Sequence, residues 1–368
     1  MQKREIAVID VGSSGITVAV GERGVNKTFL IKARREYAYD GFQDGEFFDK
    51  DSVKKILFSA ADFIRDATKR HTAQVFVGVP GEFTKVVVKE SQISFSGKKK
   101  ITDEDVDRLY DSAFVSAAGK YTLINRSAIV YELDDYRRLA NPVGSVSEIL
   151  KGKLSFVLCD NYFTEIFRNT LKASGFSDVE CVSVSLAEIM YLIEPEERDR
   201  IVMLIDAGYI TTTFSLVQGD GILYQKTFAF GGGFITAVLT QRFGIDFDIA
   251  EELKRKVNLS AVNVQKTSVV ECSDSNVYDA EEARTAIISS LDDLCEELSN
   301  CIDNCGYVIP DYVSVLVTGG GISSLRGAKE HVSKRLGVNV GVIAPKVPLM
   351  DKPTESSLIS LLDMAFSG

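Results

Sequence analysis

The sequence reads Ile9-Asp10-Val11-Gly12-Ser13-Ser14-Gly15-Ile16-Thr17 near its start and Ile205-Asp206-Ala207-Gly208-Tyr209-Ile210-Thr211-Thr212-Thr213 in its second half. Ile, Asp, Gly and Thr recur at the same offsets, and the copies lie 196 residues apart. Each copy follows an apolar run and leads into alternating residues, a pattern typical of a half-buried strand. Both then reach a turn of hairpin composition, at residues 21–24 and 218–221. We therefore predict two strand–turn–strand hairpins, one in each half of the chain.

The Asp, Gly and Ser residues at these turns favour a particular chemistry. Glycines and serines turn backbone N–H groups and hydroxyls toward one point, which suits anionic oxygens. Asp10 and Asp206 stand at strand ends, where each is placed to hold a hydrated divalent cation, since magnesium keeps several of its waters. Ordinary hairpin turns also use Asp and Gly. One copy in each half nevertheless favours two hairpins that clamp a polyphosphate from both sides.

Two glycine triplets extend this pattern. The triplet at residues 319–321 ends an apolar strand and leads through two serines into a helical pattern that reaches Lys334. The triplet at 231–233 precedes a helix expected from about 234 to 243, and a further helix is expected over 248–256. Glycines let backbone pass flat against a ligand, and a helix N-terminus attracts negative charge. The 319–321 triplet matches neither a Walker A loop nor a dinucleotide-binding loop. Glu251 and Lys254 share a helical face, where a surface ion pair is the plain interpretation.

Composition excludes several classes of protein. The chain of 368 residues is 45% apolar and 26% charged, which is typical of soluble globular proteins and suggests two domains or one large domain with an insertion. The net charge is 42 − 52 = −10, which argues against a nucleic-acid binder, and the basic run at 98–100 is interpreted as a solvated loop. No apolar run has the length of a membrane span or of a signal-peptide core, so we expect a cytoplasmic chain. Six cysteines form no Cys-x-x-Cys pair and only two histidines are present, which argues against a zinc site and for reduced thiols.

Three motifs together resemble a known family. Asp10-x-Gly-Ser-Ser, Asp206-x-Gly-x-x-Thr-Thr and Thr318-Gly-Gly-Gly occur in the order and spacing of the phosphate-1, phosphate-2 and adenosine motifs of the actin/Hsp70/sugar-kinase superfamily. Within it the chain resembles FtsA, the bacterial actin relative that attaches the cell-division ring to the membrane, and next PilM of type IV pilus machines. Residues 75–81 through 101–106 resemble the start of the FtsA subdomain 1C, and residues 230–236 to 250–254 resemble a segment from the second half of FtsA. The resemblance covers nearly the whole chain but is thin over 82–200 and 257–310.

The resemblance implies an α/β protein with the actin-like ATPase fold, in which two RNase H-like lobes face a cleft and an SHS2-like subdomain 1C is inserted. It places domain 1A at 1–80 and 163–198, subdomain 1C at 81–162, domain 2A at 199–256 and 308–368, and subdomain 2B at 257–307. From the residues themselves, apolar side chains at three- and four-residue steps between Ala283 and Ile302 predict a long amphipathic helix with a core-facing stripe.

The resemblance also implies that ATP and Mg²⁺ bind between the lobes. Asp10 and Asp206 would hold the metal through water, and Glu251 and Lys254 would lie beside the ribose and adenine. The implied nucleotide-binding residues are Asp10, Gly12, Ser13, Ser14, Asp206, Gly208, Thr211, Thr212, Gly231, Gly232, Gly233, Glu251, Lys254, Gly319, Gly320, Gly321 and Ser323.

Two departures from the family pattern concern hydrolysis. FtsA-like chains continue the second Asp-x-Gly with more glycines, whereas this chain has Tyr209 and Ile210, whose side chains would crowd the γ-phosphate or redirect the loop. MreB-like chains carry a water-orienting Glu about 22 residues before the second Asp, and Val184 stands there in this sequence. Glu188, one helical turn further on, is the nearest carboxylate and the catalytic candidate. Because phosphoryl transfer to water needs a placed base or water-orienting group, we expect at most weak ATP turnover.

The resemblance further implies partners and a location. FtsA-type proteins self-associate into filaments or rows and bind an FtsZ-like or other division or envelope protein. They usually end in a basic amphipathic helix on the membrane, but no Lys or Arg follows Lys352 here. We therefore expect residues 357–368 to form the last helix of domain 2A. Membrane contact would then be indirect, through a partner or a missing tail, at the inner face of the cell membrane.

Two other functions stay open. A PilM-type scaffold of a type IV pilus or envelope machine would hold a short peptide in a groove between 1C and 1A. A small-molecule kinase on the same fold would need an acidic base near the γ-phosphate. Asp160, at the end of an apolar strand, is the candidate for that base, although an Asp at a strand end before Asn161 is also a common turn former.

Overall fold

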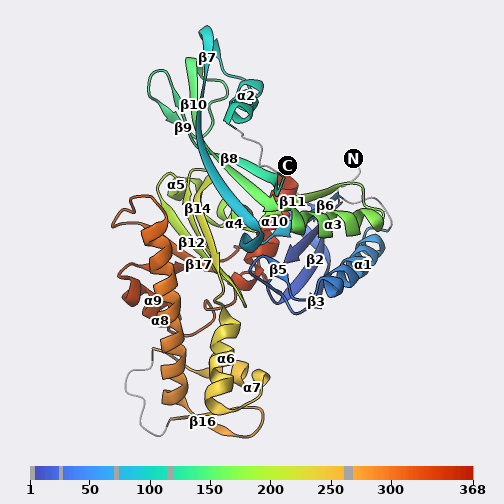
Figure 1. Ribbon diagram of the computed structural model, residues 1–368, viewed down its shortest axis with the longest axis vertical. Coiled ribbons are helices and arrows are strands. Elements are labelled where there is room, and N and C mark those ends of the chain that lie inside the picture. The colour runs from blue at the N-terminus through green and yellow to red at the C-terminus, as the bar shows by residue number, and fades with distance from the viewer. Residues whose placement is uncertain (1–4, 25–27, 70–73, 114–118, 261–267, 368) are drawn as a thin grey trace.

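The computed structural model describes residues 5–24, 28–69, 74–113, 119–260 and 268–367, and has two lobes with an elongated insertion (Figure 1). The first lobe is built on a five-stranded sheet. In spatial order its strands are β11 (Val179–Ser183), β6 (Gln74–Val79), β1 (Glu5–Val11), β2 (Gly15–Arg23) and β3 (Phe29–Ala38). Strand β1 pairs antiparallel with β2 and parallel with β6, so the sheet is mixed.

The second lobe repeats this topology. Its strands are, in spatial order, β14 (Gly221–Phe228), β13 (Thr212–Gln218), β12 (Val202–Ala207), β17 (Ser314–Thr318) and β18 (Val340–Val342). Strand β12 pairs antiparallel with β13 and parallel with β17, as β1 pairs with β2 and β6. Asp10 lies opposite Thr17 in the first hairpin, and Asp206 lies opposite Thr213 in the second. The sequence repeat is therefore a repeat of structure in the same register, as predicted.

Helices cover both faces of the first-lobe sheet. Alternate residues of a strand face opposite sides, so Ala7 and Ile9 pack in one core cluster while Ile6 and Val8 pack in another. On the first side lie α1 (Lys50–Ala67) and α3 (Asn161–Ala173), and on the second lie α4 (Val184–Leu192) and α10 (Ser356–Ser367). Short elements complete the lobe: β4 (Phe42–Gln43), β5 (Glu46–Phe47) and the 3₁₀ turn η2 (Pro353–Glu355). The short helix α5 (Pro195–Arg198) instead bonds to the second lobe, since Ser314 donates to Glu197 and Arg198 donates to Asp220.

Helix α10 belongs by its contacts to the first-lobe sheet. A side chain on Gly21 of β2 would clash with Phe366 and Leu362, and one on Gly78 of β6 would clash with Leu361. These glycines let the helix lie directly on the strands. The sequence predicts a helix here as part of the second domain, and the structure shows that its apolar face instead packs against the first lobe.

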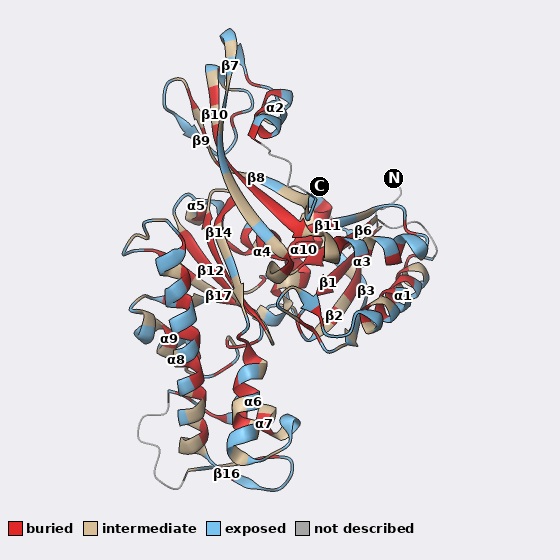
Figure 2. Cartoon of the chain, in the orientation of Figure 1, coloured by how far each residue is buried: buried red, intermediate tan, exposed pale blue. Residues whose placement is uncertain are grey.

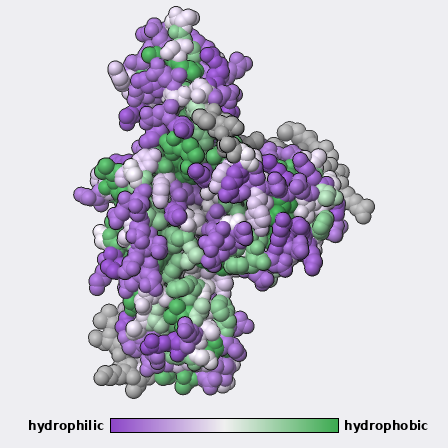
Figure 3. Space-filling model, in the orientation of Figure 1, coloured by the Kyte–Doolittle hydropathy of each residue, from purple (hydrophilic) through white to green (hydrophobic). Residues whose placement is uncertain are grey.

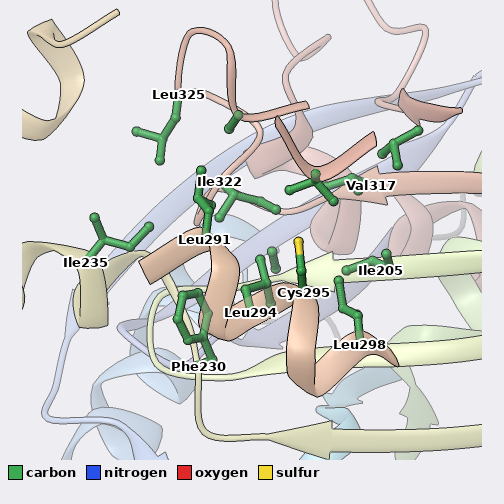
Figure 4. Packing of buried hydrophobic residues seen from close by; sticks show 14 of the residues in the cluster. Ile205, Phe230, Ile235, Leu291, Leu294, Cys295, Leu298, Val317, Ile322 and Leu325 are labelled. Atoms are coloured by element: carbon green, nitrogen blue, oxygen red, sulfur yellow. The ribbon is translucent and has the colours of Figure 1, made fainter. Parts of the chain in front are cut away.

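The core of the second lobe lies between its sheet and four helices (Figure 4). These helices are α6 (Gly232–Phe243), α7 (Phe247–Lys256), α8 (Ala280–Asn304) and α9 (Ala328–Leu336). The predicted long amphipathic helix is α8, which begins at an N-cap, Asp279, and buries Leu291, Leu294 and Leu298. Helix α9 begins at Ala328, several residues later than the pattern after the 319–321 triplet suggests. A small hairpin, β15 (Val269–Glu271) and β16 (Val277–Asp279), lies at the far end.

The insertion between β6 and α3 is a four-stranded antiparallel sheet. Its strands are β7 (Thr84–Lys100), β10 (Val146–Asp160), β8 (Tyr121–Leu133) and β9 (Arg138–Leu139), with η1 (Gly81–Phe83) before it and α2 (Asp103–Ala113) on one face. Its base contacts the second lobe, where Ser155 Oγ donates to the Ile222 carbonyl (2.8 Å) and Asp220 N donates to the Ala128 carbonyl (3.0 Å). The insertion thus extends from the first lobe and also contacts the second.

Buried residues lie in the cores of the two lobes and of the insertion. Figure 2 shows buried residues along the inner strands and helix faces of both lobes. Figure 3 shows hydrophilic residues over most of the visible face, including the tip of the insertion.

All six cysteines are buried and unpaired, as the sequence predicts for reduced thiols. Among the described residues, none of the helices combines the length and the hydropathy that a membrane span requires.

Candidate functional site

The two predicted aspartates lie at equivalent strand ends, and the charge of Asp10 acts on Asp206. Asp10 on β1 is 8% exposed, and burial raises its pKa to about 6, partly offset by a hydrogen bond from Ser357. Asp206 on β12 is half-buried, and loss of solvent, followed by the charge of Asp10, raises its pKa to about 6 as well. The charge of Asp10 acts on Asp206, and the turns that follow the two residues are in hydrogen-bond contact, so the two carboxylates form one acidic centre between the lobes.

Helix α10 begins at this centre and is bound to both lobes. Ser357 Oγ donates to Asp10 Oδ2 at 2.5 Å. Beside it, Thr318 Oγ1, at the end of β17, donates to Ser356 Oγ at 2.6 Å. Ser357 was not a sequence candidate, because a serine 347 residues from its partner carries no local signal. Tyr39 is a second such residue, since its hydroxyl donates to the Gly12 carbonyl at 2.7 Å.

The turns of the two hairpins contact each other directly. Ser13 is buried, and its Oγ accepts hydrogen bonds from the backbone N–H of Tyr209 at 3.2 Å and of Ile210 at 3.0 Å. Ser14, the next residue, is exposed. Each turn also closes on itself, because Gly12 N donates to the Gly15 carbonyl and Gly208 N to the Thr211 carbonyl, both at 2.9 Å. The structure thus brings the two predicted phosphate turns together.

Both glycine triplets lie against the second turn. Gly232 N donates to the Gly208 carbonyl (3.0 Å), and Gly321 N donates to the Ala207 carbonyl (2.7 Å). A β-carbon on Gly321 would lie 2.2 Å from the Gly208 oxygen, and one on Gly231 would lie 2.3 Å from the Tyr209 oxygen. Such separations are far below contact distance, so this crossing of three backbones requires glycine.

The remaining glycines of the two triplets, and the hydroxyls of a nearby Thr and Ser, also contact the crossing loops. A β-carbon on Gly319 would lie 2.4 Å from Asp206 Oδ1, whereas Gly320 has more room. Thr212 Oγ1 donates to the Phe230 carbonyl at 2.6 Å, and Ser323 Oγ donates to the Gly319 carbonyl. Gly233 N donates to the Tyr209 carbonyl at 2.8 Å. These contacts fix the shape of the loops around the acidic centre.

Glu251 and Lys254 come together, but not as a surface pair. Lys254 is 4% exposed, and its Nζ donates to Glu251 Oε2 (2.6 Å), the Gly232 carbonyl (2.8 Å) and Thr236 Oγ1 (2.8 Å). An ammonium group has three donors, so all of them are used inside the protein. Burial lowers the pKa of Lys254, while the partly exposed Glu251, bonded by Lys254 and Thr236, has its pKa held below the ordinary range. Lys254 therefore ties α7 to the first turn of α6.

The Tyr209 and Ile210 side chains point in different directions. The Tyr209 ring lies over Gly233, where an added β-carbon would be 2.9 Å from its Cε1, and meets Phe247 edge-on with centroids 6.3 Å apart. Ile210 reaches the first lobe, since a β-carbon on Gly41 would lie 2.6 Å from its Cδ1. The loop path expected to crowd a phosphate instead sends one side chain toward α6 and α7 and the other across the junction.

Glu188 on α4 lies within the electrostatic reach of Asp206 and Asp10. It is 1% exposed, and its Oε2 has no hydrogen-bond partner in the described part of the chain. Burial, followed by the charges of Asp206 and Asp10, raises its pKa well above the ordinary value. A carboxyl group held neutral in this way donates a proton more readily than it accepts one.

Asp160 has a structural role in α3. Its Oδ1 accepts a hydrogen bond from Tyr162 N at 2.9 Å, which caps the helix, and its Oδ2 lies 3.6 Å from Lys120 Nζ. The turn-forming interpretation of this residue therefore accounts for its contacts.

The acidic centre fits a hydrated cation better than a directly bound one. Within residues 5–24, 28–69, 74–113, 119–260 and 268–367, no group of three or more His, Cys, Asp or Glu is placed to hold a metal. Two coupled carboxylates at the ends of β1 and β12 suit a magnesium ion that keeps its own waters. Asp10 and Asp206 are the residues that could hold such an ion.

Comparison with known proteins shows which families this chain is similar to. A family model described as "Type IV pilus assembly protein PilM" matches residues 169–269. Cell division protein FtsA of Streptococcus pneumoniae serotype 2 is 22% identical over 367 residues, covering 97% of this chain and 79% of the relative.

Solved structures give the same fold. A chain of a PilM–PilN type IV pilus biogenesis complex has a TM-score of 0.64 at 16% identity, covering 99% of this chain and 98% of that one. MreB 5 of Spiroplasma citri, solved with AMPPNP, has a TM-score of 0.56 at 12% identity, covering 98% and 95%. The expected α/β fold is thus confirmed: the chain has the actin-like ATPase fold and is similar to FtsA over most of its length, with a second likeness to PilM.

Proposed function

We propose that this protein is a nucleotide-binding actin-like scaffold of the FtsA type. It binds ATP with Mg²⁺ between its lobes, associates with copies of itself, and links an FtsZ-like or other division or envelope protein to the inner face of the cell membrane through a partner. The domain division expected from the resemblance, with a 1C-type insertion, is part of the proposal.

The observation that carries the proposal is the paired acidic centre. Asp10 and Asp206 occupy the same register position in two sheets of the same topology, burial raises the pKa of both, and the charge of Asp10 further raises that of Asp206. A protein gains nothing in stability from two carboxylates that repel each other in a poorly solvated place. A cation shared by both removes that penalty, and magnesium bound there would also neutralise the charge of a triphosphate.

The side chains around the centre support binding more than catalysis. Val184 occupies the position where the resemblance implies a water-orienting Glu, and Glu188 is buried with a raised pKa, so it is poorly suited to take a proton from water. We therefore propose that the protein hydrolyses ATP slowly and that the bound nucleotide controls its assembly with other copies.

A PilM-type scaffold is the second candidate, and one observation favours it. A groove of about 910 Å³ lies at the base of the insertion, lined by residues of β7, β8, β9 and β10 and by the turn at 218–220 of the second lobe. The resemblance to PilM implies a groove between the insertion and the first domain, whereas this groove lies between the insertion and the second lobe. A bound peptide would distinguish this candidate, because it would shield residues such as Gln92 and Lys151 from solvent.

Calorimetric titration with Mg·ATP tests the proposal. We expect saturable heat for the wild-type protein and at least about 10-fold weaker binding for Asp206→Asn, since a neutral amide holds a hydrated cation poorly. Asp62→Asn, an exposed residue of α1, is the matched control and should bind as the wild type does. Absence of heat at millimolar Mg·ATP, or equal binding by all three proteins, would refute the nucleotide site.

A further inference from the structure

The hydroxyl of Ser13 lies where the second turn presents two N–H groups to one point. Tyr209 N and Ile210 N are consecutive amides, and both donate to Ser13 Oγ, at 3.2 and 3.0 Å. Consecutive amides that converge in this way form a nest for an anionic oxygen. The acceptor here is neutral, comes from the other lobe and is 8% exposed.

We propose that Ser13 is an internal latch: its oxygen occupies the phosphate-binding amides of the second lobe, holds the lobes together without a ligand, and must be displaced when a phosphate binds. The inference rests on the proposed nucleotide site and assigns Ser13 a role opposite to the one the resemblance implies. There, Ser13 is a ligand of the phosphate. Here, it competes with the phosphate.

The neighbouring amides show why Ser13 can be exchanged for a ligand. Gly208 N and Gly232 N donate to backbone carbonyls, which are fixed parts of the loop crossing. Tyr209 N and Ile210 N instead donate to a side-chain hydroxyl, which a rotation about one bond can withdraw. A charged phosphate oxygen also accepts stronger hydrogen bonds than a neutral hydroxyl does, so it can replace Ser13.

A second contact encloses the latch. A β-carbon on Gly41 would lie 2.2 Å from the Ser13 carbonyl and 2.6 Å from Ile210 Cδ1, so the backbone at Gly41 lies close to both residues. Gly41 has a φ of +95°, which glycine adopts without strain. Ile210, which departs from the family pattern, thus lies beside Gly41 of the first lobe. Amides that lose Ser13 have lost their protein acceptor, and a phosphate oxygen can take its place.

Ser13→Ala separates the two roles by the sign of its effect. If Ser13 is the latch, its loss leaves two amides unpaired in the free protein, and Mg·ATP binding should tighten by roughly 10-fold, the equivalent of one to two hydrogen bonds. If Ser13 is a phosphate ligand, the same substitution weakens binding. Ser96→Ala, the same change at an exposed serine of β7 in the insertion, should alter affinity little.

Hydrogen–deuterium exchange provides the second readout, on the full chain without nucleotide. We expect the amides of Tyr209 and Ile210 to exchange roughly 10-fold faster in Ser13→Ala than in the wild type or Ser96→Ala, since a broken hydrogen bond leaves an amide open to exchange. The amides of α8 serve as the folding control and should be equally protected in all three proteins.

The two readouts have separate consequences. Faster exchange at these amides together with tighter Mg·ATP binding supports the latch. Unchanged exchange, or weaker binding by Ser13→Ala, overturns it. If no variant binds Mg·ATP, the proposed nucleotide site fails, and the displacement of the latch by phosphate fails with it, while the exchange result still decides whether Ser13 holds the lobes together.

Discussion

Replacement of Asp10 by Asn should stabilise the protein in the absence of nucleotide and metal. The pKa of Asp10 is raised from 3.8 to about 6, chiefly because the side chain is buried. At 1.36 kcal/mol per unit, ionised Asp10 costs the folded protein about 3 kcal/mol at pH 7. An Asn carries no charge, and its side-chain oxygen can still accept the hydrogen bond from Ser357.

The dependence on pH has a definite sign. A carboxyl group whose pKa is higher in the folded state holds its proton more tightly there than in the unfolded chain. The contribution of Asp10 to stability is therefore fully present below about pH 4 and is lost as the pH rises through about 6. Relative to Asp10→Asn, the wild type should lose stability over this window and show a constant deficit above it.

Urea denaturation between pH 4 and 8, with a chelator present, measures both effects. We expect the free energy of unfolding of Asp10→Asn to exceed that of the wild type by up to about 3 kcal/mol at pH 7, and the difference to vanish near pH 4. Asp62→Asn should differ from the wild type by less than about 0.5 kcal/mol throughout. A less stable Asp10→Asn, or a difference that does not change with pH, would refute the claim of a strained acidic centre.

Three other predictions concern the surrounding structure. Lys254→Met should lower the free energy of unfolding in urea by about 3 kcal/mol, because it removes the cation that pairs with Glu251 and with two oxygens of α6. The same change at the exposed Lys55 should cost little, and a loss below about 1 kcal/mol for Lys254→Met would contradict the buried network. Gly321→Ala should destabilise the second lobe by about 1–3 kcal/mol and weaken Mg·ATP binding, because its methyl group would lie 2.2 Å from the Gly208 oxygen. Gly97→Ala, which has open space around it, should do neither. Steady-state ATP turnover should fall well below the ~1–100 s⁻¹ of ordinary kinases, and a rate within that range in a phosphate-release assay would show that a water-orienting group had been missed.

The fold was largely predictable because its main signal is local. The two Asp-x-Gly hairpins have the same internal spacing, and the structure places Asp10 and Asp206 at the same register. The stripe that ends at Ile302 predicted α8, since one apolar face at helical spacing must be buried. In each case a few neighbouring residues decide the outcome.

The contacts between lobes were not predictable in the same way. Nothing near Ser13 shows that its hydroxyl meets the amide of Ile210, and nothing near Ser357 shows that it reaches Asp10. Lys254 was interpreted first as a surface residue, because helical spacing identifies its partner Glu251 but not the α6 carbonyl beyond it. Contacts of this kind depend on how distant segments cross, and that information is spread over the whole chain.

A crystal structure of the protein with Mg²⁺ and a non-hydrolysable ATP analogue would test the central claim most directly. We predict that the phosphates lie between residues 12–14 and 208–211, with one magnesium ion bound through water to both Asp10 and Asp206. An analogue bound elsewhere, or a metal held by one lobe while the other aspartate stays remote from it, would contradict the account.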